Sequence, residues 1–196
     1  KNFKDGVFPN TNEKWEFKNL KTLHINLTKH MLEPGQTSTS SNIKVFDNIN
    51  FISELDSIEN LSIIGSNHEQ AFSIDGLKNF LKLKYLKTSG LGYANVDALC
   101  NLKNLNYVKL SEDNLSDVSG LTNSENLEFI DLSSSKKLDN IIPLRKLKNI
   151  KLIDISYTQV NLLNGLENSV NIHGVKAVNT PIKNLDGLVN AKNIYC

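Results

Sequence analysis

The sequence of 196 residues lacks several features that define common protein classes. It has two cysteines, Cys100 and Cys196, which are too few and too far apart for a disulfide framework. Arg145 is the only arginine among 22 basic residues, and a net charge of +1 excludes nucleic-acid binding through a basic surface. The densest apolar run, Leu61–Ile64, is far shorter than the roughly 18 residues of a membrane span, so we exclude membrane insertion.

The first residues, Lys1–Asp5, include no initiator methionine and no apolar stretch typical of a signal peptide. We therefore expect a processed or truncated chain whose targeting segment has been removed. Two thiols suit a cytosolic protein, and they also suit a bacterial surface protein that does not use disulfides.

Asparagine and leucine are the abundant residues, with 28 copies of each. Asparagine favours turns over the interiors of helices and strands, so the chain must turn often. An apolar content of 39% is too high for a disordered chain. A chain rich in both turns and leucine is a candidate for internal repeats.

A repeat is visible in the apolar residues that begin the later repeats, from Leu83 to Ile194, because successive ones are 22, 22, 23, 22 and 22 residues apart. Within each repeat the first, fourth and sixth places are apolar, which predicts a short strand with alternate residues buried. Earlier repeats begin at Leu20 and Ile58, and their longer spacing indicates insertions. The later repeats begin at Leu83, Leu105, Leu127, Ile150, Ile172 and Ile194.

A second set of apolar residues follows each strand, three residues apart. This spacing predicts a single tight helical turn with one face buried. The sets are Tyr93, Val96 and Leu99; Leu115, Val118 and Leu121; Val160, Leu163 and Leu166; and Ile182, Leu185 and Leu188.

Segments such as Leu105–Glu125 and Ile172–Asn193 resemble leucine-rich repeats of the 22-residue class, found in bacterial internalins and in similar phosphatase-regulating proteins. The resemblance implies an α/β solenoid, a horseshoe with a concave parallel sheet and short 3-10 or irregular turns on the convex side. In such a solenoid the core runs continuously between repeats, because no repeat buries its apolar stripe alone.

The repeat pattern divides the chain into an N-terminal cap, residues 1–19, and leucine-rich repeats, residues 20–196. The second part comprises seven repeats and the first strand of an eighth. Insertions at about 28–42, 65–70 and 133–137 all follow a strand, so we expect them on one rim. The C-terminal edge needs a cover, either a further capping segment or another copy or domain in end-to-end contact.

Two polar columns recur at fixed places of the repeat. One directly precedes the strand, and we interpret it as turn chemistry; it comprises Asn19, Asn104, Asn126, Asn149, Asn171 and Asn193. The other is the ninth place, where the usual asparagine is replaced but backbone hydrogen bonding at a bend is still expected; it comprises Asp113, Ser135, Thr158 and Thr180.

The third and fifth places of each strand point out of the concave face. A row of large apolar side chains beside charged ones is typical of a protein-binding patch. Two alternatives remain, since the rings could simply stack on each other and Lys109 could pair with Asp131 within the chain. The predicted partner-binding residues are Tyr85, Tyr107, Phe129 and Leu152 at third places, and Lys87, Lys109, Asp131 and Asp154 at fifth places.

No catalytic, metal or cofactor site is predicted. His24, His30 and His68 lack the spacing of a metal site, even with Glu33 and Glu69 nearby. The Ser-x-x-Lys pattern at Ser133–Lys136 is without the further motifs that its chemistry would need.

Together these features favour a non-catalytic recognition module of a bacterial surface or secreted protein, which binds a partner protein on its concave face. The alternative is a cytoplasmic regulator that inhibits an enzyme by covering it, as an immunity protein or a phosphatase regulator would.

Overall fold

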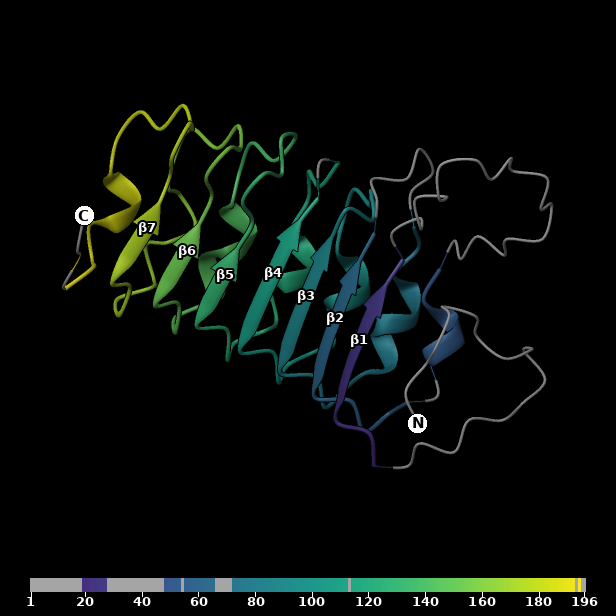
Figure 1. Ribbon diagram of the computed structural model, residues 1–196. Coiled ribbons are helices and arrows are strands. Elements are labelled where there is room, and N and C mark those ends of the chain that lie inside the picture. Colours follow the sequence, from purple (N-terminus) through teal and green to yellow (C-terminus); the bar gives the residue numbers. More distant parts are fainter. Residues whose placement is uncertain are drawn as a thin grey trace, which may run out of the picture.

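The computed structural model describes residues 19–27, 48–53, 55–65, 72–112, 114–192 and 194. Seven strands form one parallel sheet in which every strand pairs with its neighbours in chain order (Figure 1). They are β1 (Thr22–Asn26), β2 (Asn60–Ile64), β3 (Tyr85–Ser89), β4 (Tyr107–Ser111), β5 (Phe129–Asp131), β6 (Leu152–Asp154) and β7 (Gly174–Lys176).

Each of the seven strands begins at the third place of a predicted repeat, so the positions predicted for these seven are confirmed. From Ile58 to Ile172 the first place is fully buried in every repeat. The fourth and sixth places are buried from β2 to β6, and among them only Ile130 is exposed at all, at 2%. The predicted leucine-rich-repeat solenoid is therefore the fold of this chain.

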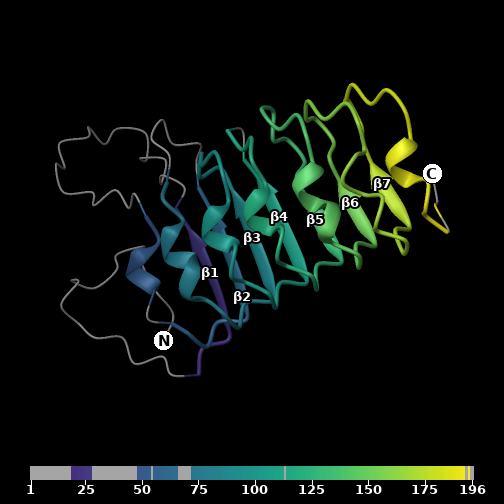
Figure 2. The same ribbon diagram turned by 180° about the vertical axis from the view of Figure 1, so that it is seen from behind.

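Short 3-10 helices lie behind the sheet, on the convex side (Figure 2). The first five pack on one another in sequence order, and the buried apolar residues of all six enter the same core as the strands. They are η1 (Asn50–Ile52), η2 (Asp75–Asn79), η3 (Asp97–Leu99), η4 (Ser119–Leu121), η5 (Ile142–Lys146) and η6 (Asp186–Leu188).

Each of these helices is preceded by a polar side chain that accepts a hydrogen bond from its first backbone N–H. Asp117 Oδ1, for example, accepts from Ser119 N at 2.7 Å, and Asn140 Oδ1 from Ile142 N at 3.1 Å. Such acceptors satisfy donors that a helix start leaves without a partner. The other acceptors are Asn48, Ser73, Asn95 and Asn184.

The repeat that begins at Ile150 has no such acceptor and forms no 3-10 helix. Leu162 occupies the acceptor's place, and an aliphatic side chain cannot accept the bond. The single turn predicted over Val160–Leu166 is present without a 3-10 helix, and in it Leu166 N donates to Leu163 O at 3.1 Å.

The core is one continuous cluster that extends through all the described coils. The predicted convex residues are buried, with one clear exception at Leu185, which is 63% exposed. No further coil packs against it within the described residues. Leu185 instead lines an open apolar cavity of about 500 Å³, together with Val175, Ile182 and Leu188.

Three asparagines of the column that precedes the strand join successive coils, a role beyond the turn chemistry predicted for that column. Asn104 Nδ2 donates to Leu81 O at 2.8 Å, Asn126 Nδ2 to Lys103 O at 3.0 Å and Asn149 Nδ2 to Glu125 O at 2.9 Å. A second column that the sequence analysis did not single out makes the same kind of bond; it comprises Asn123, Asn168 and Asn190.

Three of the ninth-place residues bond to backbone as predicted, although not all within one coil, and the fourth, Asp113, lies outside the described residues. Thr158 Oγ1 donates to Ile155 O and Thr180 Oγ1 to Ala177 O, each at 2.7 Å within its own bend. Ser135 Oγ reaches back to the preceding coil and donates to Leu110 O at 3.1 Å.

Most of the predicted cap, the insertion at 28–42 and residues 66–70 of the second insertion lie outside the described residues. The insertion at 133–137 is described and forms the bend after β5, where Ser134 has a left-handed backbone with φ of 67°. The division into a cap, seven repeats and an eighth strand stays a prediction.

The 3-10 helices approach so closely that glycine is needed at the second residue of η4. A Cβ on Gly120 would lie 1.8 Å from the Val96 carbonyl oxygen of the preceding coil. We expect Gly120→Ala to lower the free energy of unfolding by about 1–3 kcal/mol, because the coils must move apart.

Urea unfolding measures this change, and Ala98→Gly is the matched control. Ala98 holds a Cβ at the same place in the preceding coil, so its removal should cost only about 0.5–1 kcal/mol. Equal stability of wild type and Gly120→Ala would contradict this packing.

Candidate protein-binding surface

We call the outward face of the sheet the concave face, and its two predicted columns lie in register as expected. Tyr85 pairs with Tyr107, Tyr107 with Phe129, and Phe129 with Leu152 across adjacent strands. The fifth-place residues Lys87, Lys109, Asp131 and Asp154 pair in the same way. All eight residues are half-buried, so their outer parts are accessible.

The two tyrosines of the row stack on each other. Their ring centroids lie 4.4 Å apart and their planes differ by 11°. Parallel strands place such rings at a separation that favours stacking. Burial raises the pKa of Tyr107, and the neighbouring Tyr85 and Asp131 add to the shift. Tyr107 is therefore a neutral hydrogen-bonding group at physiological pH.

The charges in the centre of the face are partly satisfied within the chain. Lys109 Nζ forms an ion pair with Asp131 Oδ2, and Asp131 Oδ1 accepts from Ser133 N at 3.0 Å. Partial burial opposes ionisation of Asp131, but the bonds from Lys109 and Ser133 outweigh it, so its pKa is lowered. Both alternatives raised by the sequence are thus realised, namely the ring stack and the internal ion pair.

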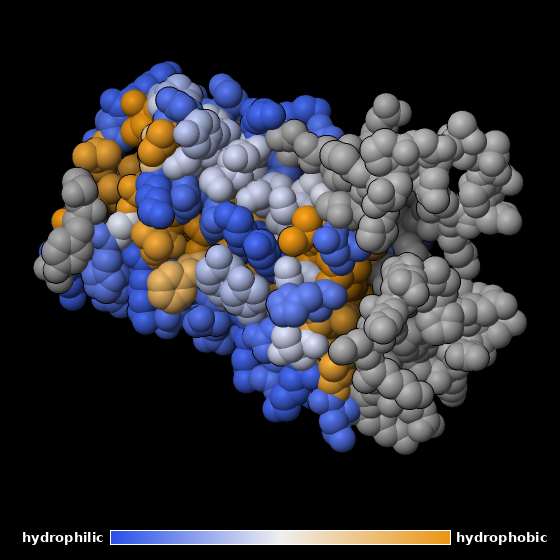
Figure 3. All heavy atoms as spheres, viewed as in Figure 1, coloured by the Kyte–Doolittle hydropathy of each residue, from blue (hydrophilic) through white to orange (hydrophobic). Residues whose placement is uncertain are grey.

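The C-terminal half of the face is less self-contained. Phe129 and Leu152 adjoin there, and Figure 3 shows apolar side chains over β5 and β6 beside hydrophilic ones. Asp154 Oδ1 accepts from Ser156 N at 2.9 Å. Within the described part of the chain, Lys87 and Asp154 form no ion pair.

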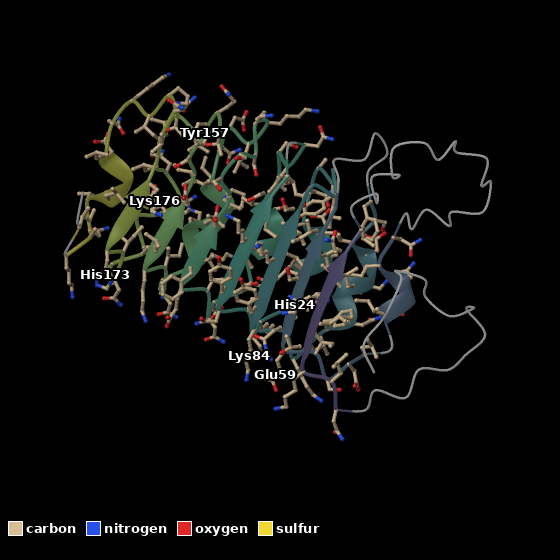
Figure 4. The ribbon with its side chains drawn as sticks, in the orientation of Figure 1. His24, Glu59, Lys84, Tyr157, His173 and Lys176 are labelled. Carbon is tan, nitrogen blue, oxygen red and sulfur yellow. The ribbon has the colours of Figure 1, made fainter. Side chains whose placement is uncertain are left out.

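A row of ion pairs, not predicted from the sequence, lies along the rim where the strands begin. Glu59 Oε1 lies 2.8 Å from Lys21 Nζ, and Glu59 Oε2 lies 2.8 Å from Lys84 Nζ. Figure 4 labels Glu59 and Lys84 on this rim. Farther along, Lys151 Nζ lies 2.8 Å from Glu128 Oε2. The alternating charge sign at the second place of the repeats was the signal that could have revealed it.

A buried acidic side chain was also missed. Glu112 is fully buried at the end of β4, and its Oε2 accepts from Leu91 N at 2.6 Å and Gly92 N at 2.8 Å. Nearby, the hydroxyls of Thr88 and Tyr93 are hydrogen-bonded to each other. Burial raises the pKa of Tyr93 well above its usual value, and the charge of Glu112 adds to this. Glu112 thus holds the bend after β3 through Leu91 and Gly92, and because it is buried it is not accessible to a partner protein.

The described residues include no group of three His, Cys, Asp or Glu side chains able to hold a metal ion, while His30, His68, Glu33 and Glu69 lie outside them. Cys100 is an exposed free thiol at the end of η3, on the convex side. Within the described ranges, no helix is long and apolar enough to cross a membrane.

Comparison with known proteins identifies the class of fold. No protein-family model matches the chain, and no curated protein sequence is significantly similar to it. Three similar solved structures are two internalins and a leucine-rich-repeat protein, so the chain has the leucine-rich-repeat fold.

Two of these structures are internalins of Listeria monocytogenes. InlF has a TM-score of 0.63 and 19% identity, over 74% of this chain and 43% of its own. Internalin C2 has a TM-score of 0.61 and 23% identity, and the match covers 78% of this chain and 77% of internalin C2. A leucine-rich-repeat protein of Leptospira interrogans has a TM-score of 0.64 and 16% identity, over 89% and 42%. This chain thus spans less than half of two of the three.

The ion pairs at Glu59 predict a pH dependence of stability. Hydrogen bonds from Lys21 and Lys84 lower the pKa of Glu59 from 4.5 to about 2. A carboxylate whose pKa is lower in the folded state stabilises the fold above its unfolded pKa and loses that effect as the pH falls. We expect Glu59→Gln to be less stable than wild type at pH 7, and the difference to disappear between about pH 4.5 and 2.

Chemical unfolding of both proteins across this pH range measures the difference. Glu125→Gln is the control, because Glu125 forms no ion pair within the described residues. A Glu59→Gln difference that stays constant down to pH 2 would show that these pairs do not act as described.

Proposed function

We propose that this chain is a non-catalytic protein-recognition module whose concave face binds a partner protein. The observation that supports it is the in-register row of Tyr85, Tyr107, Phe129 and Leu152 beside a charged column. A folded monomer gains little from large apolar side chains on an open face, whereas an interface uses them as anchors.

The size of the row suits an interface. Aromatic side chains can bury about 150–250 Å² each, against the roughly 800 Å² that one partner contributes to a standard interface. Three rings and a leucine could thus supply much of one side. Because Tyr85 and Tyr107 stack, a partner would meet their edges and hydroxyls, while Phe129 and Leu152 offer apolar contact.

The compartment is part of the same proposal. Structural likeness to internalins favours a bacterial cell-surface or secreted protein. A cytoplasmic regulator that covers an enzyme could use the same face, and the start of the complete gene distinguishes the two, since a secretion signal supports the first and a plain initiator methionine the second.

Alanine substitution tests the face. After affinity capture identifies a bound protein, we expect Tyr107→Ala and Phe129→Ala each to weaken its binding by about 2 kcal/mol or more, because each removes a central anchor. Titration of the purified partner against each variant measures the loss.

Ile142→Ala is the matched control. Ile142 is 47% exposed on η5, behind the sheet, so the variant also removes exposed apolar surface but from the opposite side. Full affinity in both concave-face variants, with or without an effect of Ile142→Ala, would refute binding through this face.

A further inference from the structure

The bend after the strands requires a left-handed backbone at the eighth place of most repeats. Gly90, Ser134, Tyr157 and Asn179 occupy it, with φ of 67°, 67°, 59° and 52°. Glycine adopts this conformation freely and asparagine tolerates it, whereas a bulky side chain is disfavoured there. Tyr157 is thus the one residue of these four that the backbone argues against.

The fold gives Tyr157 no compensating role. Its side chain points outward from the rim where the strands end, and the residue is 51% exposed (Figure 4). The hydrogen bond of the residue, from Tyr157 N to Val178 O at 2.8 Å, uses backbone atoms that any residue would supply. A strained residue without a structural reason points to function.

The residue joined to Tyr157 by that bond departs from its own column as well. The seventh place is serine in four successive coils, and Val178 follows them; the serines are Ser89, Ser111, Ser133 and Ser156. Val178 is 56% exposed. From the coil of β3 onward these two places are otherwise small or polar, and Tyr157 and Val178 depart from them at the same point of the rim.

The exposed charged side chain beside this pair is positive, whereas the neighbouring Asp154 is half-buried. Lys176 lies on the sheet face two residues before Val178, is exposed, and forms no ion pair within the residues that the structure describes. Asp154, its partner in register, already accepts from Ser156 N. The surface thus offers an aromatic ring, an aliphatic side chain and an ammonium group.

We infer that Tyr157, Val178 and Lys176 form a second contact site, the rim site, for a segment of a protein partner in which an apolar side chain neighbours a carboxylate. The apolar side chain would pack on Tyr157 and Val178, and the carboxylate would pair with Lys176. This inference rests on the proposed function and extends the binding surface from the concave face onto the rim.

A library of random twelve-residue peptides displayed on phage provides a defined probe. Selection on the wild-type chain should enrich peptides that combine large apolar residues with aspartate or glutamate. We expect Tyr157→Ala and Lys176→Gln each to weaken binding of an enriched peptide about tenfold or more.

Ser134→Asn is the matched control, because Ser134 occupies the same left-handed, exposed place in the preceding coil and asparagine is tolerated there. It should bind as wild type does. Comparing Tyr157→Gly with Tyr157→Ala separates binding from folding. Both remove the ring, but glycine relieves the strain, so its thermal midpoint should be higher by about 2–4 °C while both bind weakly.

The inference is overturned if no acidic–apolar peptides are enriched, or if they bind Tyr157→Ala as tightly as wild type. The proposed function is tested separately by Tyr107→Ala and Phe129→Ala. Loss of partner binding in those variants, with peptide binding unchanged in Tyr157→Ala, would retain the concave face and reject the rim site.

Discussion

The structure depends on one constraint, that no coil can bury its apolar stripe alone. The first, fourth and sixth places of each repeat point inward, and these residues are covered by the coils on either side. Successive coils must therefore stack in register, and the parallel pairing from β1 to β7 is the result. Asparagine amides reinforce this register by bonding from one coil to backbone carbonyls of the previous coil, as Asn126 does to Lys103.

Stacking in register also decides what remains for recognition. Because equivalent places lie side by side, a residue type repeated at the third place becomes a row, and Tyr107, Phe129 and Leu152 form such a row. From β3 to β5 several side chains of the concave face already contact one another, since Tyr85 stacks on Tyr107 and Lys109 forms an ion pair with Asp131. Toward the C-terminal end, exposed apolar and charged groups are left without such partners inside the described chain, and there the backbone tolerates strain at Tyr157.

The repeat period was sufficient to predict the strands, the inward places and both columns, because burial every second residue leaves a strong pattern. It was insufficient where a single residue alters the coil. The spacing at Val160–Leu166 matches that of the other coils and could not indicate that Leu162 leaves this coil without a 3-10 helix, because capping depends on an acceptor and not on apolar spacing. The amide bonds between coils and the burial of Glu112 were missed, since their partners lie about 20 residues away in the sequence and are brought close only by stacking. The strain at Tyr157 was missed for another reason. A left-handed backbone can be predicted from the sequence only where glycine or asparagine occupies the place.

The central claim is that stacking uses the inward side chains and leaves the concave face for a partner protein. Hydroxyl-radical footprinting of the chain, alone and with its captured partner, tests this most directly because it reports the solvent access of individual side chains. The account predicts that oxidation of Tyr107, Phe129 and Leu152 falls on binding while that of Leu81 and Ile142, exposed apolar residues outside the sheet, is unchanged. Protection of Leu81 and Ile142 with the concave row still fully oxidised would contradict it.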